Sequence, residues 1–327
     1  MKHHGKTLLS ALALTVMSAG ACDSGDENSP EFRALADNSS ALNGIALNGI
    51  ALNGGELAGA TLESAVAPDG DTIKFAWTSI ISGRMMLLTD GGSFFHGSGA
   101  IGTELTFKTG EGDYRLIVND AVLHSDGEFK GGPLYHYDLH YEVKSADGWT
   151  GDTTALCNDG QGNPTEALFL PGEWDQETGD RLSYSATSLT AACRQGALAK
   201  CAEWGYRPGL MPNTHQTCLR MVRADYDGSG VPHTLNGTTI NVGDVYGINH
   251  QASEPGLMKE AEWGPNGAIC LNREFLRHPE LSGCDDPNDP ETCFPGIPEC
   301  WGDPEDLQIF LYWWGARMVT AIGIEPQ

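Results

Sequence analysis

Apolar and polar positions alternate along residues 56–149, which is the period of two that a half-buried β-strand requires. The clearest alternating runs cover residues 73–80, 114–118 and 134–143. Gly-Gly and Asp-Gly pairs separate the runs, and such pairs favour hairpin turns. The pattern therefore predicts an antiparallel β region over residues 56–149.

Helical periodicity begins only later in the chain. A helix is predicted over 188–203, where a serine can cap its first turn and a Gly-rich segment follows its end. A second, shorter helix is predicted over 214–224, and strand patterns return at 234–248 and 267–272. Pro304 and the two acidic residues after it predict the start of a final apolar helix.

Composition supports a mixed, strand-rich fold. Glycine accounts for 42 of the 327 residues and charged residues for only 19%, which fits loops and strands better than a helical bundle. The hydrophobic share of 40% is sufficient for a packed core. The predicted fold class is α+β, with a Gly-rich antiparallel β region followed by a disulfide-cross-linked α+β region over 150–327.

The first residues have the pattern of an export signal. Residues 1–21 contain no acid, begin with two lysines and continue with an apolar run too short to span a bilayer. The small residues before Cys22 resemble a bacterial lipobox, although Ala19 stands where leucine is usual. We therefore expect residues 1–21 to be a signal peptide, and Cys22 to carry a lipid that attaches the protein to a membrane. The expected location is the outer membrane or cell surface, and the alternative is a secreted or periplasmic protein.

A polar segment follows the predicted leader. Residues 22–55 begin with acidic and small side chains and continue with the five-residue repeat Ala-Leu-Asn-Gly-Ile. This composition buries little apolar surface, so the segment is predicted to be a flexible tether. For the repeats, two interpretations remain open: a semi-ordered linker, or a coil that caps the following sheet.

Nine cysteines are present, and setting Cys22 aside leaves 9 − 1 = 8, which can pair fully in an oxidising compartment. Cys193 and Cys201 lie eight residues apart on one predicted helix, too far to bridge each other. Each is expected to bond another segment, with Cys157, Cys218 and Cys270 as candidates. A zinc–thiolate site is disfavoured because the sequence has no Cys-x-x-Cys spacing. The predicted disulfide cysteines are Cys157, Cys193, Cys201, Cys218, Cys270, Cys284, Cys293 and Cys300.

The charge balance excludes one class of partner. The formal net charge is −25, and loss of the two leader lysines makes it −25 − 2 = −27. Such a surface repels nucleic acid and attracts divalent cations. Residues 309–324 form the longest late apolar run, but Arg317 interrupts it and it is too short to cross a bilayer.

Several blocks in the middle of the chain carry a family resemblance. They are Ala192 to Cys201, Gly205 to Pro208, Cys218 to Tyr226, His233–Thr234, Asn236 to Thr238, Gly247–Ile248 and Glu262 to Cys270. Together they resemble the ADYC domain, found in exported bacterial proteins and named after an Ala-Asp-Tyr-Cys motif, over about residues 150–275. The resemblance implies an extracytoplasmic protein, often with a lipoprotein leader, and no established activity. Asp227 stands where the motif has cysteine, which implies that this family disulfide and its partner cysteine are absent.

Oxygen-bearing side chains follow the resemblance motif at calcium-loop spacing. Asp225, Asp227 and Ser229 stand at positions one, three and five of such a loop, with Gly230 at position six. Position twelve is Asn236, whereas these loops use a bidentate glutamate there. The segment is therefore either a calcium site or a polar turn, and calcium is the one cofactor that the sequence suggests.

A second candidate site lies on the predicted strand over 134–143. Its period of two places His136, Asp138, His140 and Glu142 on one face. Imidazole and carboxylate groups in this arrangement can bind a transition metal. The alternative is a solvated strand face opposite an apolar one.

Three weaker patterns complete the set. Residues 97–102 match a dinucleotide-binding fingerprint but lack the following helix that such a site needs. His215 precedes Cys218 and marks either a site or a packed helix. Trp313 and Trp314 belong either to the core or to a carbohydrate-binding surface.

No catalytic constellation stands out. The sequence thus predicts a lipid-anchored binding or structural protein of the cell envelope, with a metal-dependent hydrolase or carbohydrate-binding module as alternatives.

Overall fold

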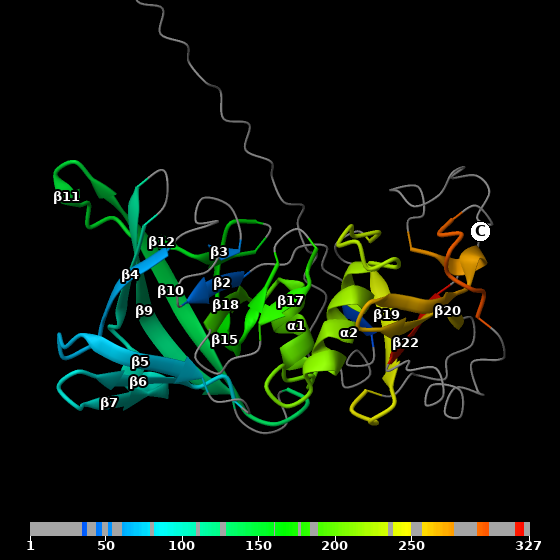
Figure 1. The fold of residues 1–327 in the computed structure, drawn as a ribbon, viewed down its shortest axis with the longest axis horizontal. Helices are drawn as coiled ribbons and strands as arrows, with labels where there is room; N and C mark the ends of the chain where they lie inside the picture. Colours follow the sequence, from blue (N-terminus) through cyan, green and yellow to red (C-terminus); the bar gives the residue numbers. More distant parts are fainter. Residues whose placement is uncertain are drawn as a thin grey trace, which may run out of the picture.

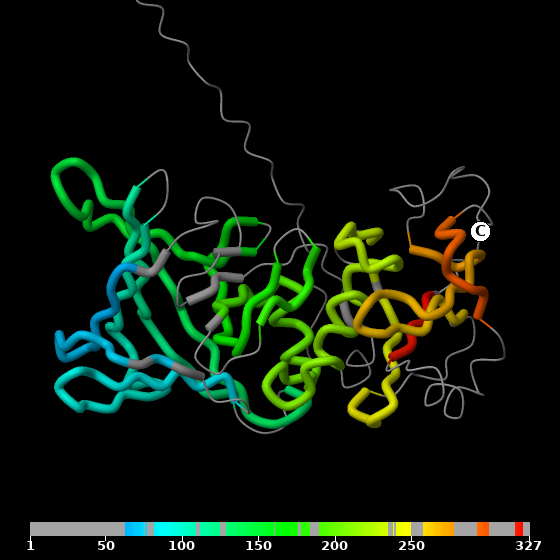
Figure 2. The backbone as a smooth tube through the Cα atoms, in the orientation of Figure 1, coloured from blue at the N-terminus to red at the C-terminus, as the bar shows by residue number. Residues whose placement is uncertain are grey.

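In the computed structural model, two β assemblies lie on either side of a pair of helices (Figure 1). The structure describes most of residues 61–300, together with strands at 35–37, 44–47, 52–53 and 318–323. Residues not described within the larger range are 79–81, 109–111, 125–128, 160, 176–177, 184–188, 235–237, 250–256 and 278–292. Figure 2 shows that the chain runs broadly from one end of the molecule to the other, while its last strand returns among the strands that precede it.

The first assembly is a ten-stranded sheet, and its strands pair antiparallel. Its main order is β3-β2-β18-β15-β10-β9-β8-β4, and β11 and β12 pair with β10. The strands are β2 Gly44–Leu47, β3 Leu52–Asn53, β4 Thr61–Val66, β8 Glu104–Lys108, β9 Asp113–His124, β10 Leu134–Ser145, β11 Gly148–Trp149, β12 Thr154–Ala155, β15 Ala167–Pro171 and β18 Leu189–Cys193.

A smaller sheet covers one face of the large one and encloses the first hydrophobic core. It consists of β5 Ile73–Thr78, β6 Met85–Thr89 and β7 Phe94–His96, followed by the short helix η3 Gly97–Ala100. The Tyr137 hydroxyl on β10 accepts a hydrogen bond of 2.6 Å from the Met85 backbone N–H on β6. Leu87, Phe107 and Leu116 are fully buried in the same cluster. Alternate residues of β10 therefore face this core.

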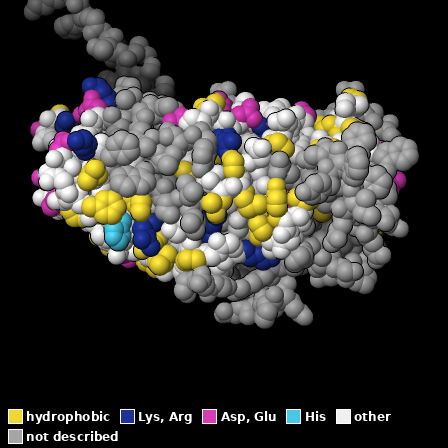
Figure 3. All heavy atoms as spheres, turned by 60° about the horizontal axis from the view of Figure 1, so that its bottom comes forward, with side chains coloured by type: hydrophobic (Ala, Val, Ile, Leu, Met, Phe, Trp, Pro, Cys, Tyr) yellow, Lys and Arg dark blue, Asp and Glu magenta, His cyan; other side chains and the backbone are white. Residues whose placement is uncertain are grey.

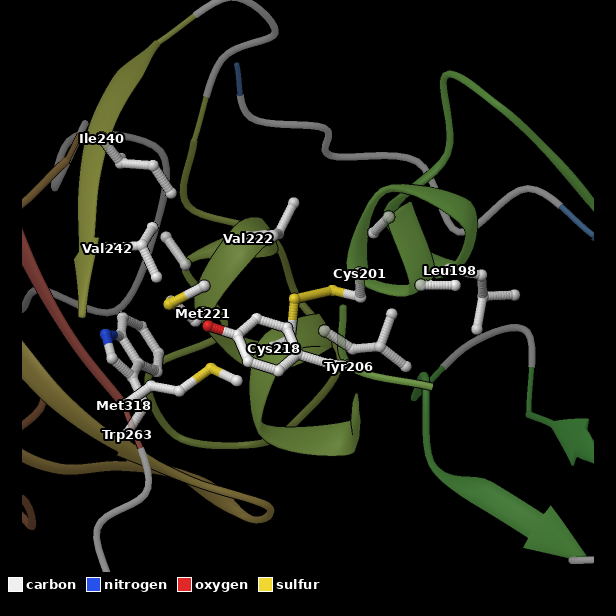
Figure 4. Close-up of a cluster of buried hydrophobic side chains, with 14 of the residues drawn as sticks. Leu198, Cys201, Tyr206, Cys218, Met221, Val222, Ile240, Val242, Trp263 and Met318 are labelled. Atoms are coloured by element: carbon white, nitrogen blue, oxygen red, sulfur yellow. A yellow bond between two sulfur atoms is a disulfide. The ribbon is translucent and has the colours of Figure 1, made fainter. Parts of the chain in front are cut away.

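The second core lies between the helices and a five-stranded sheet. The helices are α1 Ala197–Glu203 and α2 Pro212–Arg223, and the sheet order is β1-β19-β22-β20-β21. The strands are β1 Leu35–Asp37, β19 Thr239–Asp244, β20 Leu257–Gly264, β21 Gly267–Leu271 and β22 Met318–Gly323. Figure 4 shows Met221 of α2 close to Val242 of β19, and Val222, Ile240 and Trp263 belong to the same buried cluster.

Short elements complete the described structure. Two hairpins pair β13 Cys157–Asn158 with β14 Pro164–Thr165, and β16 Glu173–Trp174 with β17 Arg181–Ser183. A short helix, η4 Arg273–Phe275, follows β21.

The coarse fold class is confirmed, and so are the main strands. The β pattern over 73–80, 114–118 and 134–143 corresponds to β5, β9 and β10, and the predicted helix over 214–224 corresponds to α2. Strands dominate and helices are few among the residues that the structure describes, which agrees with the α+β class in its coarse form. The ten-stranded sheet includes strands from both sides of residue 149.

The helix predicted over 188–203 is wrong in its first half. Leu189–Cys193 forms β18, which pairs with both β15 and β2, and only Ala197–Glu203 is helical. The small alanines of this segment suit a helix locally, but strand pairing satisfies its backbone on both sides. Trp204 ends α1, and Gly205 follows it with a φ of 100°, as a helix-stopping glycine does.

The end of the chain also differs from the prediction. Met318, which belongs to the apolar run over 309–324 after the predicted helix start, begins β22, and this strand lies between β19 and β20 in the five-stranded sheet. The predicted start of that helix at Pro304 and the two tryptophans at 313 and 314 lie outside the described residues. Within the predicted tether, β1 pairs with β19 and β2 pairs with β18.

Candidate functional site

A buried hydrogen-bond network is centred on Tyr226, just after α2. The Tyr226 hydroxyl donates to Glu260 Oε1 on β20 at 2.6 Å and accepts from the Arg277 backbone N–H at 3.0 Å. Arg277 Nε donates to the same glutamate oxygen at 2.6 Å, and Nη2 donates to the Met221 carbonyl at 2.7 Å. Thr320 Oγ1 on β22 donates to Glu260 Oε2 at 2.6 Å. The network therefore connects the end of α2 with two strands of the second sheet.

The electrostatics of this network are those of a closed structural site. Tyr226, Glu260 and Thr320 have no exposed surface, and Arg277 is also buried. Burial, followed by the negative charge of Glu260, raises the pKa of Tyr226 well above its ordinary value. The hydroxyl therefore remains protonated and keeps its hydrogen bond to the carboxylate.

The residues before Tyr226 direct it inward. Ala224 has a left-handed conformation with φ 52°, and this ends α2. The buried Asp225 carboxylate accepts a hydrogen bond of 2.5 Å from Arg220 and two of 3.1 Å from the Gly230 N–H. The Ala-Asp-Tyr segment thus has three packing roles: a helix stop, a buried ion pair and an anchor to the second sheet.

The same contacts describe the predicted calcium loop. Both oxygens of Asp225 face N–H donors inside the protein, whereas Asp227 is exposed and accepts a hydrogen bond of 3.0 Å from the Ser229 N–H. The positive Arg220 also neutralises the carboxylate that would be the first calcium ligand. The contacts account for a polar turn, and calcium binding stays a prediction.

The four candidates on β10 do not act as one group, and the buried Glu142 pairs with Arg115 at 2.5 Å. His136 is fully buried, so the solvated-face interpretation is wrong for it, while Asp138 and His140 are partly exposed and pair with each other at 3.2 Å. A register shift between Asp138 and Leu139 interrupts the strand pairing with β9. Near His136 both faces of β10 are covered, because Tyr137 faces the small sheet and His136 faces α1.

His136 instead belongs to a cluster with His124 and Glu166. One ligand atom from each of the three residues lies within 4.8 Å of the others, and they are the one such group among the described residues. His136 Nδ1 lies 3.1 Å from Glu166 Oε2, and His124 Nε2 lies 3.8 Å from the same oxygen. The two imidazole centroids are 4.4 Å apart.

Four elements position this cluster. His124 ends β9 opposite Leu134 of β10, which places it diagonally across from His136 on the neighbouring strand. Glu166 directly precedes β15, and Glu203 at the end of α1 lies 3.2 Å from His136 Nε2. Sequence reasoning found His136 but missed His124 and Glu166, because neither stands in a local spacing motif with it.

Charges in the cluster influence one another. Burial lowers the pKa of His136, but its contacts with Glu166 and Glu203 outweigh this, and the net pKa is raised. The hydrogen bond to His136 lowers the pKa of Glu166. Arg194 donates from Nε to Glu203 at 2.8 Å and lies 3.6 Å from Glu166. The two carboxylates are thus partly balanced by one guanidinium.

His215 of α2 is a buried packing residue. Its side chain lies 3.1 Å from the Leu198 carbonyl and packs near the Trp174 ring at a centroid distance of 5.4 Å. Burial lowers its pKa from 6.5 to about 3. The folded protein therefore holds this imidazole neutral at pH values where an unfolded chain would protonate it.

The free energy of unfolding is expected to decrease as the pH is lowered, because His215 stays neutral in the folded protein. Between pH 7 and pH 4.5 the unfolded state gains a proton that the folded state does not take up, so the free energy of unfolding should drop by about 2–3 kcal/mol from this residue. Urea unfolding of the wild type and His215→Gln across this range measures the contribution, because glutamine keeps a donor but does not titrate. Asn213→Gln, an exposed change on the same helix, should follow the wild-type slope. Parallel slopes for wild type and His215→Gln would contradict the expectation.

The described cysteines form disulfides. Cys157 bonds Cys193, Cys201 bonds Cys218 and Cys270 bonds Cys300. Cys193 and Cys201 thus bond other segments, as expected, although Cys193 lies on a strand and not on the helix.

Cys293 is also disulfide-bonded. Cys22 and Cys284 lie outside the described residues. Disulfides persist in oxidising compartments, so these bridges fit an extracytoplasmic protein. Within the described residues, no helix combines the length and apolar character needed to cross a membrane.

The described residues and their bridges define a disulfide-stabilised, mainly antiparallel β protein in which α1 and α2 lie between the ten-stranded and the five-stranded sheet. The ADYC domain matches residues 97–277, and the chain belongs to this family. The match begins well before the resemblance predicted from residue 150, and it includes β9 and β10 with both histidines of the cluster. No curated protein and no solved structure matches the chain.

Proposed function

We propose that this protein is an exported, lipid-anchored component of the cell envelope with a binding or structural role. The observation that carries the proposal is the set of three disulfides between described cysteines, each of which joins two different elements or segments of the fold. Cross-linking of this kind stabilises proteins that work outside the cytoplasm. The leader pattern over 1–21 and the cysteine at position 22 support attachment to a membrane.

The family motif Ala-Asp-Tyr supports a structural role for its residues in preference to a catalytic one. The groups of Asp225 and Tyr226 are buried and already bonded within the protein, so they offer no contact to a substrate. On the face shown in Figure 3, hydrophobic side chains lie in several groups among polar and basic ones. Scattered hydrophobic side chains of this kind are ordinary on a surface that faces water, so this face singles out no partner.

Lipid attachment is tested by metabolic labelling with a palmitate analogue. The wild type and the control Ser29→Ala should be labelled and recovered with membranes, because both keep the cysteine after the leader. Cys22→Ala should lose the label. Equal labelling of Cys22→Ala and wild type would overturn the anchor, and free thiols throughout an unprocessed cytoplasmic product would overturn export itself.

A further inference from the structure

We propose that His124, His136 and Glu166 bind one divalent transition-metal ion, for which Zn²⁺ is the best chemical match. Two imidazole nitrogens and one carboxylate oxygen form a ligand set that zinc accepts. Three protein ligands leave a coordination position open for water or another ligand, as in reactive rather than purely structural zinc sites. The site does not depend on the lipid anchor and goes beyond a structural role.

The distances between the ligand atoms suit a small ion. Around a tetrahedral zinc with bonds of about 2.0–2.2 Å, neighbouring ligand atoms lie roughly 3.3–3.6 Å apart. Glu166 Oε2 lies 3.1 Å from His136 Nδ1 and 3.8 Å from His124 Nε2, and all three atoms fall within 4.8 Å of one another. The two distances to Glu166 bracket the tetrahedral spacing, and the widest separation, up to 4.8 Å, would close by about 1 Å through rotation of the partly exposed His124 and Glu166 side chains.

The surroundings of His136 are those of an oriented metal ligand. Its Nδ1 faces the cluster, while its Nε2 lies 3.2 Å from Glu203 Oε1. Metal-binding histidines commonly contact a carboxylate through the second ring nitrogen, which fixes the ring and increases its basicity. Arg194 holds Glu203 in turn, with a hydrogen bond of 2.8 Å. Phe129 packs against both imidazoles, at centroid distances of 5.5 and 5.0 Å.

Access and charge also favour a cation. The side chains of His124 and Glu166 are 18% and 32% exposed, so an ion can reach the cluster from solvent, whereas His136 is fully buried. Glu166 and Glu203 contribute two negative charges and Arg194 one positive charge. Their sum leaves a net negative charge that a divalent cation compensates. All five of these residues lie within the ADYC match.

The test uses the full mature chain, stripped with a chelator and titrated with ZnCl₂ by calorimetry. Bound zinc is counted by elemental analysis. The variants are His124→Gln and Glu166→Gln, whose partly exposed side chains permit folding, and thermal unfolding without metal verifies that they fold. The control is His140→Gln. It removes another histidine of β10, one that pairs with Asp138 outside the cluster.

Wild type and His140→Gln are expected to bind one zinc per chain, and zinc should raise their melting temperatures. Loss of a residue that only supports a metal ligand weakens metal binding about 10–100-fold, so His124→Gln and Glu166→Gln, which remove ligands, should each weaken zinc binding by at least that much and lose the rise in melting temperature. The proposal is overturned if the wild type binds no stoichiometric zinc, as expected of an ion-pair network alone. It is also overturned if either ligand variant keeps wild-type affinity, or if His140→Gln loses affinity as well.

Discussion

Arg277→Met is expected to lower the free energy of unfolding by about 3–5 kcal/mol, because it leaves the Glu260 carboxylate buried without its cation. The pair is fully enclosed, with Arg277 Nε 2.6 Å from Glu260 Oε1 and side-chain exposures of 1% and 0%. The change also removes the donor to the Met221 carbonyl at the end of α2. Denaturant unfolding followed by circular dichroism measures the loss.

Two further variants separate the charge effect from simple packing. Replacing both partners, in Arg277→Met with Glu260→Met, should cost less than the sum of the single changes, because no unpaired charge remains. Lys144→Met removes the cation of the exposed Lys144–Asp113 pair and should cost under about 1 kcal/mol. If Arg277→Met were no more harmful than Lys144→Met, the network around Tyr226 would not hold the second sheet to α2.

Removal of the Cys201–Cys218 bridge should destabilise the protein by a similar amount. The bridge joins α1 to α2 in the middle of the second core, where both cysteines are fully buried (Figure 4). It closes a sequence separation of 17 residues, for which the lost restriction of the unfolded chain is worth about 3 kcal/mol. The Cys201→Ala and Cys218→Ala double variant also loses packing around the sulfurs, so a total of about 3–5 kcal/mol is expected.

A double-mutant cycle isolates the bridge. Either single variant already breaks it, so each should lose nearly as much stability as the double variant, and the two single losses should not add. Urea unfolding of the four proteins at one pH provides the values. Additive single effects would mean that the two sulfurs act only as packing groups and that the bridge contributes nothing.

The two largest effects both concern the connection between the helices and their surroundings. Cys218 and Met221 lie on α2, and Tyr226 follows directly after it. The Ala-Asp-Tyr residues therefore fix how α2 ends and where the second sheet attaches. This gives the family motif a physical role, independent of any chemistry at the histidine cluster.

Much of the fold could be predicted because it depends on local pattern. The alternation along residues 134–143 identified β10, and the even number of cysteines after position 22 identified a set of bridges. Local pattern failed where two structures suit the same residues. Leu189–Cys193 became a strand because β15 and β2 are available on both sides of it.

The histidine cluster shows why a site is harder to predict than a strand. His136 was found from its spacing to Asp138 and His140, but the fold turns it toward Glu166 and Glu203 and leaves the other two paired with each other. The alternation along a strand shows which residues share a face. It does not show which elements pack on that face, and this packing decides whether a histidine contacts solvent or a carboxylate.

The sequence by itself determined the main strands β5, β9 and β10, the second helix, the cysteine set and the family blocks, because each depends on residues close together in the chain. The tertiary structure alone decided which cysteines pair, that Tyr226 meets Glu260 and Arg277, and that His124 and Glu166 join His136. Those contacts join residues on different elements, and only the packing of sheet against helix brings their atoms within bonding distance.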